Sequence, residues 1–145
     1  HYETRLANLF GAGVQACYRG PRIYDTEETK QVVKKWISFY KQHREVLDAD
    51  IVHLRRPDGR DWDGLLHVNP QGREKALAFV YNPLDRSISR KIRVPLEYAG
   101  LAGAAMVSID GGEAGKVTLD PAGFAVIDVN IPAKGRTWML FSQAR

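Results

Sequence analysis

The sequence has almost no cysteine and no long apolar run. Its 145 residues include one cysteine, Cys17, so the chain can form no internal disulfide and no multi-cysteine metal site. Cys17 lies among small and apolar residues with no neighbouring base, a pattern typical of a buried structural thiol rather than of a nucleophile. No stretch approaches the roughly 18 consecutive apolar residues of a membrane-spanning helix, so the sequence predicts no membrane span.

Motifs for cofactors and metals are also missing. The segment Gly11-Ala12-Gly13 lacks the third glycine and the preceding strand of a phosphate-binding loop. The four histidines show no metal-ligand spacing, so neither a metal nor a cofactor is predicted. His53 and His67 alternate with apolar residues on neighbouring predicted strands, which favours cross-strand packing over a shared site.

The composition is that of a soluble globular protein. Apolar residues make up 44% of the chain and charged residues 26%, with 13 glycines and 7 prolines. These values exclude a wholly disordered or collagen-like chain. The length fits one domain, or one domain and a piece of another. Because the chain starts at His1 and shows no leader pattern, we expect a processed form or a fragment.

The net charge of +4 comes from one segment of the chain. Between Arg73 and Arg93, six basic residues stand against two acidic ones. This segment contains a strand pattern, so Lys91 and Arg93 are expected on the solvent face of an exposed strand. No aromatic RNA-binding motif accompanies them, and no nucleic-acid partner is predicted.

Residues 25–47 follow the period of an amphipathic helix. Asp25 is expected to cap its N-terminus, and Glu28 to complete a capping box. The expected apolar face consists of Val33, Ile37, Tyr40 and Leu47, widened by Val32, Trp36 and Phe39. Residues 6–14 predict a short preceding helix that two glycines break.

After residue 50 the apolar period changes to two, which is typical of strands. Residues 76–81 are apolar on both faces, which predicts a central strand. Gly111-Gly112 predicts a hairpin turn. The predicted fold class is therefore mainly β: an antiparallel β-sandwich of about eight strands, preceded by one long amphipathic α-helix and a short N-terminal helical segment.

The densest polar cluster lies at residues 55–64. Its carboxylates, Asp58, Asp61 and Asp63, suggest calcium, but the EF-hand spacing fails because glycine and proline stand where oxygen ligands are required. Interspersed arginines favour an Arg–Asp network instead. Asp61 and Asp63 could meet the spacing of a glycosidase carboxylate pair, as could any surface pair. Trp62 could stack on a sugar ring, although its alternation with later apolar residues favours the core.

Three parts of the chain carry a resemblance to a known enzyme family. Residues 36–47 hold a Tyr-Lys-x-x-Arg pattern within an aromatic-rich helix, residues 50–57 follow as a strand, and residues 66–70 and 78–83 form a hairpin pattern. In this order they resemble the end of retaining glycoside hydrolases of the α-galactosidase/α-glucosidase type. In those enzymes the last helix of a (β/α)8 barrel runs into a C-terminal β-sandwich.

The resemblance implies a function without catalysis in this chain. It implies that residues 1–49 form the end of a barrel and that residues 50–145 form the C-terminal β-sandwich domain. The family's catalytic aspartates lie on earlier barrel strands and match no position here. No catalytic residue is therefore assigned, and the chain alone is expected to be inactive although its parent is expected to be a glycoside hydrolase. The implied role is a non-catalytic accessory module that packs on, and stabilises, the catalytic barrel of the same parent chain.

A few residues are candidates for contact with a glycan. Tyr18, Arg19 and Arg22 lie on the loop that would follow the eighth barrel strand and could line the substrate rim, and Trp62 completes the substrate-binding set. Without its barrel, the helix at residues 25–47 would expose apolar surface, which predicts a homo-oligomer formed through that helix. A periplasmic or extracellular location is compatible with such a protein.

Two alternative functions stay open from the sequence. A self-standing carbohydrate-binding β-sandwich requires exposed aromatic side chains in line, for which Trp62, Trp138 and Tyr98 are the candidates. A general interaction domain could bind a polyanion through Lys91 and Arg93, with a steep salt dependence.

Overall fold

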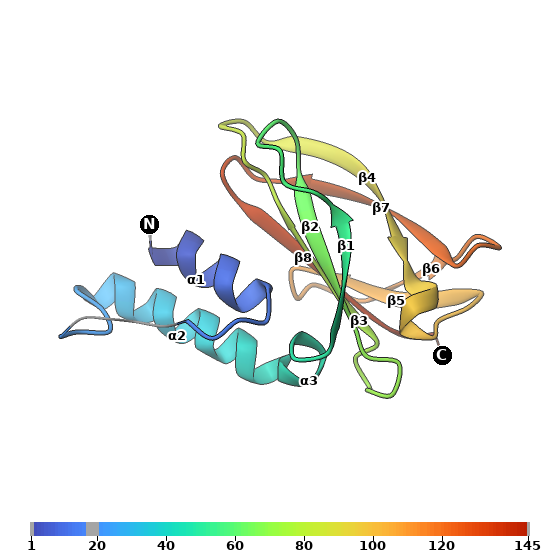
Figure 1. Cartoon of the computed structure of the whole chain (residues 1–145), viewed down its shortest axis with the longest axis horizontal. Helices are drawn as coiled ribbons and strands as arrows, with labels where there is room; N and C mark the ends of the chain where they lie inside the picture. The colour runs from blue at the N-terminus through green and yellow to red at the C-terminus, as the bar shows by residue number, and fades with distance from the viewer. Residues whose placement is uncertain (1, 17–20, 145) are drawn as a thin grey trace.

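The computed structural model describes residues 2–16 and 21–144 of the chain. Helices pack on one face of a six-stranded sheet, and a two-stranded sheet packs on the other (Figure 1). The helices are α1 (Tyr2–Gly11), α2 (Glu27–Gln42), α3 (Arg44–Leu47) and the short 3-10 helix η1 (Leu96–Ala99). The strands are β1 (Asp50–Arg55), β2 (Asp63–Val68), β3 (Ala76–Tyr81), β4 (Ile88–Pro95), β5 (Ala104–Ile109), β6 (Gly115–Thr118), β7 (Phe124–Ile131) and β8 (Arg136–Gln143). The predicted mainly β fold class is confirmed.

All strand pairs are antiparallel. The larger sheet has the order β1-β2-β3-β8-β5-β6, and β4 pairs with β7 in the smaller one. Strand β3 lies between β2 and β8, which confirms the central position predicted from its two apolar faces. None of the described helices is both long and apolar enough to cross a membrane.

The larger sheet separates two hydrophobic cores. The sandwich core lies between the two sheets and is formed by Leu66, Val68, Ala76, Ala78, Val80, Ile88, Ile92, Val94, Leu96, Ala99, Leu101, Ala105, Leu119, Ala125, Ile127, Val129, Ile131, Met139 and Phe141. The helix-side core lies between the same sheet and the helices and is formed by Ala7, Phe10, Trp36, Phe39, Val46, Leu47, Leu77 and Phe79. Because side chains alternate along a strand, β3 supplies residues to both cores.

The start of α2 differs from the sequence prediction. Thr26, not Asp25, is the N-cap: its hydroxyl accepts from the Thr29 N–H at 3.2 Å, and the Thr29 hydroxyl accepts from the Thr26 N–H at 2.9 Å. Glu28 is therefore not part of the capping box. The Asp25 carboxylate instead accepts a hydrogen bond from the Tyr2 hydroxyl at 2.6 Å, which joins the beginnings of α1 and α2.

The single helix predicted for residues 25–47 is divided at His43. Gln42 ends α2, and Arg44 begins the short helix α3. The buried stripe of α2 consists of Val33, Trp36 and Phe39, whereas Ile37, expected on the apolar face, is 37% exposed. The reason is that α2 is covered by the sheet and α1 along one side only.

The small sheet confirms that Lys91 and Arg93 lie on the solvent face of a strand. Lys91 and Arg93 lie on the solvent side of β4, with 74% and 59% of their side chains exposed. They pair with Asp128 at 2.8 Å and Asp120 at 3.3 Å, so the local positive charge is partly neutralised.

The hairpin turn after β5 is shifted by one residue from its predicted position. Its two left-handed residues are Asp110 (φ 50°) and Gly111 (φ 76°) rather than Gly111-Gly112. The Gly112 N–H closes the turn on the Ile109 carbonyl at 2.9 Å. Aspartate tolerates positive φ better than most residues, which explains the shift.

Candidate functional site

Aromatic rings join the helices to the sheet. The Phe39 ring of α2 lies 5.9 Å from that of Phe79 on β3 and 5.0 Å from that of Trp138 on β8, both edge-on. Trp36 lies 6.0 Å from Phe79. Gly11 at the end of α1 makes the close approach possible, because a Cβ there would stand 2.9 Å from the Phe79 ring. Such ring pairs fix the position of the helices as well as burying area.

A hydrogen bond between two side chains strengthens the same interface. His43, only 3% exposed, places its Nδ1 2.6 Å from the Glu74 carboxylate in the loop between β2 and β3. The His43 ring also packs on Phe39 and Trp138, at 5.0 and 5.2 Å. The junction of α2 and α3 is therefore anchored to the sheet by both polar and aromatic contacts.

The helix-facing side also contains unsatisfied polar atoms. Among the described residues, the buried side-chain atoms without a hydrogen-bond partner are Trp36 Nε1, His67 Nδ1 and the Tyr81 hydroxyl. Trp36 Nε1 approaches Glu3, and the His67 ring approaches the Leu47 carbonyl, without completing a hydrogen bond. Each such group costs about 1–3 kcal/mol, so the helix-side core is less completely paired than the sandwich core.

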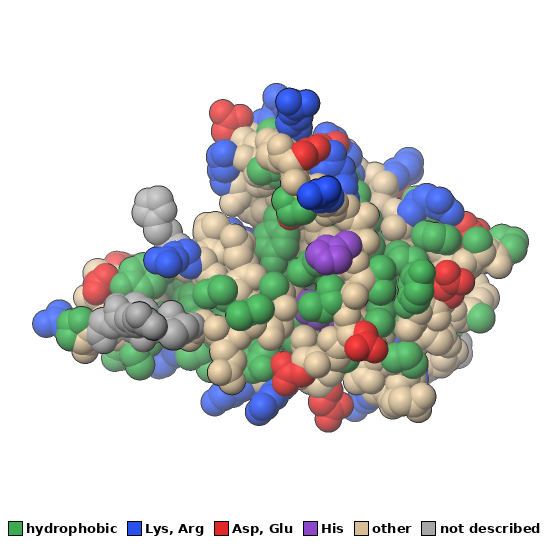
Figure 2. Space-filling model, viewed as in Figure 1, with side chains coloured by type: hydrophobic (Ala, Val, Ile, Leu, Met, Phe, Trp, Pro, Cys, Tyr) green, Lys and Arg blue, Asp and Glu red, His purple; other side chains and the backbone are tan. Residues whose placement is uncertain are grey.

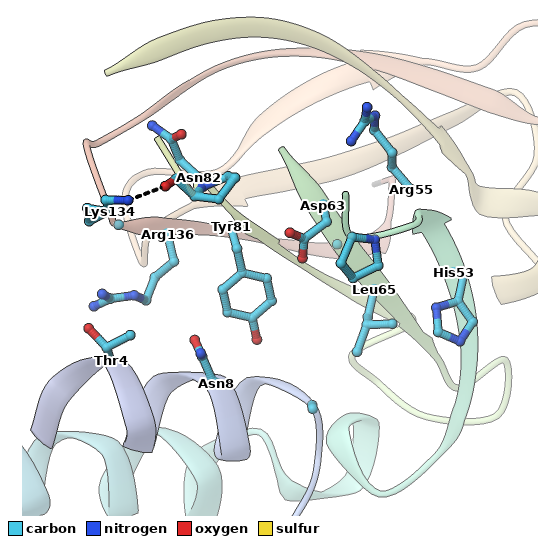
Figure 3. A pocket seen from close by; sticks show the side chains of 15 residues that line it. Thr4, Asn8, His53, Arg55, Asp63, Leu65, Tyr81, Asn82, Lys134 and Arg136 are labelled. Atoms are coloured by element: carbon cyan, nitrogen blue, oxygen red, sulfur yellow. Dashed lines mark hydrogen bonds between the residues drawn. The ribbon is translucent and has the colours of Figure 1, made fainter. Parts of the chain in front are cut away.

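A groove of about 730 Å³ opens between α1 and the edge of the larger sheet. Figure 3 shows Thr4 and Asn8 on α1 directed toward side chains of β2, β3 and β8. Its polar lining on the sheet side includes Asp63, Tyr81 and Arg136. A cavity of this size and mixed lining is typical of small-molecule sites.

Asp63 and Tyr81 are cross-strand neighbours in this groove. Burial raises the pKa of the Asp63 carboxyl, while the Arg55 guanidinium acts in the opposite direction. Burial also raises the pKa of the Tyr81 hydroxyl, and the Asp63 carboxylate adds to that shift. The Asp63 side chain makes no hydrogen bond or ion pair with the described residues, so its acceptor capacity is unused.

The basic side chains around the groove interact with other groups of the protein. Arg55 donates to Asp58 at 2.8 Å and to the Trp62 carbonyl at 2.6 Å. Lys134 donates to the Pro83 carbonyl at 2.6 Å. Arg136 has a side chain 16% exposed, with its guanidinium 6.0 Å from the Trp36 ring centre and 3.8 Å from Glu3.

The predicted Arg–Asp network is present. The hydrogen bond from Arg55 holds the pKa of Asp58 well below its usual range. Arg90 binds Asp61 at 3.0 Å. Asp61 is therefore occupied by an arginine while Asp63 lines the groove, and the two do not act as a matched carboxylate pair. No three His, Cys, Asp or Glu side chains within residues 2–16 and 21–144 are arranged to hold a metal ion.

The predicted substrate-binding residues are not brought together where they are described. Tyr18 and Arg19, like Cys17, lie outside the described residues. Arg22 is exposed on the loop between α1 and α2, whereas Trp62 is half-buried against the sandwich core.

The aromatic side chains proposed for a glycan platform are also dispersed. Trp138 packs against the helix-side core, and Tyr98, 55% exposed, lies on η1. No line of exposed aromatics exists among the three candidates. His53 and His67 do not share a site either: His53 is exposed, while buried His67 lies 2.7 Å from the Gly11 carbonyl through Nε2.

Apolar side chains remain on the outer surface of the helical region. Among the described residues of the helices and their connection, the exposed large apolar side chains are Val14, Ile23, Tyr24 and Ile37. Figure 2 shows apolar surface over the helices between patches of charge. Exposed apolar area on a helix that is already packed on its other side is typical of an interface.

The comparisons with known proteins give matches of fold. No family model and no curated protein matches the sequence. The GH27 β-L-arabinopyranosidase of Geobacillus stearothermophilus matches 97% of this chain with 29% of its own, at a TM-score of 0.64 and 11% identity. α-Galactosidase I of Mortierella vinacea matches 99% with 36% of its own, at 0.62 and 11%. The α-amylase of Geobacillus thermoleovorans, complexed with acarbose, matches 100% with 34%, at 0.60 and 14%.

The chain shares its fold with a part of each of these glycoside-acting enzymes. The resemblance predicted from the sequence is confirmed at this level. The chain spans about a third of the length of the enzymes it matches. The match includes the helices as well as the sheets, because 97–100% of the chain is covered.

The sequence alone did not indicate the groove. Its lining comes from α1, β1, β2, β3 and β8 and from the loops between strands, and these segments are dispersed along the chain. In the sequence, Asp63 is one carboxylate of a cluster, and nothing in the local pattern distinguishes it from Asp61. Their different environments follow from the register of β2 with β3 and from the position of Arg90.

Proposed function

We propose that this chain is the non-catalytic C-terminal accessory module of a glycoside hydrolase, and that it packs on and stabilises a catalytic barrel. The observation that carries the proposal is the asymmetric fold match: nearly all of this chain corresponds to about a third of each matching enzyme. A module with that relation to its neighbours works as part of a longer polypeptide.

The proposal assigns residues 1–49 to the end of the barrel and residues 50–145 to the β-sandwich domain. The helices bury their aromatic side on the sheet through the helix-side core. Their outer surface keeps Val14, Ile23 and Ile37 exposed. Contact with the rest of a barrel would cover that surface.

Catalysis belongs to the proposed barrel. Barrel chemistry takes place in a pocket built by loops at the C-terminal ends of eight strands. Asp61 and Asp63 do not act together as a glycosidase carboxylate pair, since Asp61 is bound by Arg90 and Asp63 lines a separate groove. Tyr18, Arg19 and Arg22 are proposed to contribute to the substrate rim once the barrel is present.

Activity measurements test whether the longer polypeptide is catalytic and this chain is not. Antibodies against residues 1–145 are used to capture the natural polypeptide from its source cells, and the captured protein and the recombinant chain are compared on chromogenic glycosides. We expect hydrolysis by the captured protein and none by the recombinant chain. Hydrolysis by the recombinant chain would overturn the non-catalytic assignment.

Self-association tests the proposed barrel-facing surface. The isolated chain is expected to form oligomers at high concentration in sedimentation velocity experiments, because its exposed helical surface is apolar. Ile37→Glu should yield monomers, whereas the control Val126→Glu, at a position 49% exposed on β7, should not change the oligomer. A monodisperse monomer of the unmodified chain would contradict this assignment of the surface.

A further inference from the structure

The groove between α1 and the larger sheet has features that packing alone does not require. We infer that it binds a neutral polyhydroxylated ligand, of the size of a mono- or disaccharide, with the Asp63 carboxylate as its principal hydrogen-bond acceptor. The inference does not depend on the proposed function.

The shape of the groove fits such a ligand. Its volume of about 730 Å³ lies within the range of small-molecule sites. Leu65, Pro57 and Pro83 supply apolar wall, suited to the C–H faces of a sugar ring. Asn8 on α1 and Asp63 on β2 supply polar groups from opposite walls (Figure 3).

The chemistry of the acceptor points to hydroxyl groups. An ionised carboxylate has two oxygens and accepts hydrogen bonds without donating any. Asp63 has no such partner among the described residues, although it is half-buried. Two neighbouring hydroxyls of a polyol can donate to both carboxylate oxygens at once.

The surrounding charges favour a neutral ligand over an ion. Arg55, Lys134 and Arg136 lie around the groove and repel a cation. Arg55 is neutralised by Asp58, Arg136 lies over the Trp36 ring, and Lys134 gives one of its three N–H groups to the Pro83 carbonyl. The unpaired Asp63 carboxylate would in addition repel an anion.

Nuclear magnetic resonance tests the inference directly. Amide signals of the 1–145 chain are followed during titration with D-galactose, maltose or L-arabinose, and in parallel with inorganic phosphate and methylamine. We expect at least one sugar to shift signals of Asn8, Asp63 and Leu65 in a saturable manner, with no such response to the two ions. Absence of a groove response to every sugar, or a response only to an ion, would overturn the inference.

Variants locate the ligand within the groove. Asp63→Asn removes the charge but keeps the side-chain volume, and should weaken sugar binding at least about tenfold. Asp128→Asn, a matched change on the small sheet, should leave the affinity unchanged. An unaltered affinity in Asp63→Asn would overturn the assignment of the acceptor.

A second variant probes the helical wall. Asn8→Ala, at an exposed position of α1, should weaken binding about threefold through loss of one neutral hydrogen bond. Unchanged affinity would place the sugar away from α1 and overturn the groove as its site. These results are independent of whether the chain belongs to a longer enzyme, so the two proposals fail separately.

Discussion

The two faces of the six-stranded sheet are packed in different ways. Toward the small sheet, the sandwich core is almost wholly aliphatic and contains a single aromatic residue, Phe141. Toward the helices, the core is rich in aromatic rings, and buried His43 at its edge is hydrogen-bonded to half-buried Glu74. The buried polar atoms without partners, among the described residues, lie on this second side.

This difference shows which face belongs to an ordinary domain core and which resembles an interface. Aliphatic side chains on alternating strand positions close the sandwich without polar groups. Aromatic residues are enriched at protein interfaces. The helices therefore resemble a docked layer, in agreement with the proposal that they belong to a barrel.

The largest expected effects come from removing a ring on each face. Phe141→Ala in the sandwich core and Phe79→Ala in the helix-side core both alter fully buried side chains, at 0% exposure. Each should lower the free energy of unfolding by about 3–5 kcal/mol. Hydrogen exchange should then separate them: Phe79→Ala exposes amides of α1 and α2, whereas Phe141→Ala exposes those of β4 and β7. Identical exchange patterns would show that both faces form one cooperative unit.

Removing the His43–Glu74 hydrogen bond is expected to act on the helix-facing side. Glu74→Ala leaves His43 buried without its partner, and should reduce the free energy of unfolding by about 1–3 kcal/mol. Glu45→Ala on α3 serves as the control, since that exposed side chain makes no ion pair with any described residue. Urea denaturation measures both variants, and equal stabilities would contradict the importance of the pair.

The helix-facing side should also give a pH dependence. Burial lowers the pKa of His67 below its ordinary value of 6.5. As the pH falls below 6.5, His67 binds a proton in the unfolded chain but stays neutral in the folded chain. The free energy of unfolding therefore decreases until the pH reaches the lower pKa of His67 in the folded chain. One such proton gives a slope of at most about 1.4 kcal/mol per pH unit.

Two histidine variants isolate that slope. His67→Gln retains an N–H donor for the Gly11 carbonyl and should flatten the dependence of unfolding free energy on pH below about 6.5. His53→Gln changes an exposed ring and should leave the slope intact. A slope that persists in His67→Gln would assign the pH dependence to other groups.

The smallest expected effect concerns the start of α2. Thr26→Ala removes the capping hydroxyl and should cost about 1 kcal/mol. Glu28→Ala, at the position that the sequence pattern favoured, should change stability much less. Thermal unfolding distinguishes the two, and the reverse order would restore Asp25 and Glu28 as the capping pair.

Regular apolar patterns made much of the fold predictable. Apolar residues alternate with polar ones along β7, and both faces of β3 are apolar. Both patterns predict the strands correctly, because the buried positions follow the two-residue period of a strand. The predicted N-cap of α2 was wrong by one residue. Asp25 and Thr26 are both good capping residues, and in the structure Thr26 occupies the N-cap position. The groove was not predictable, since Asn8, Asp63 and Arg136 meet only through tertiary packing.

The size of the natural polypeptide tests the central claim most directly. An antibody against residues 1–145 is applied to extracts of the source cells, and the mass of the recognised protein is measured. The account predicts a polypeptide about three times the 16.3 kDa of this chain, since the chain corresponds to 29–36% of the enzymes whose fold it shares. A natural polypeptide of 16.3 kDa would contradict the assignment as a module of a larger glycoside hydrolase.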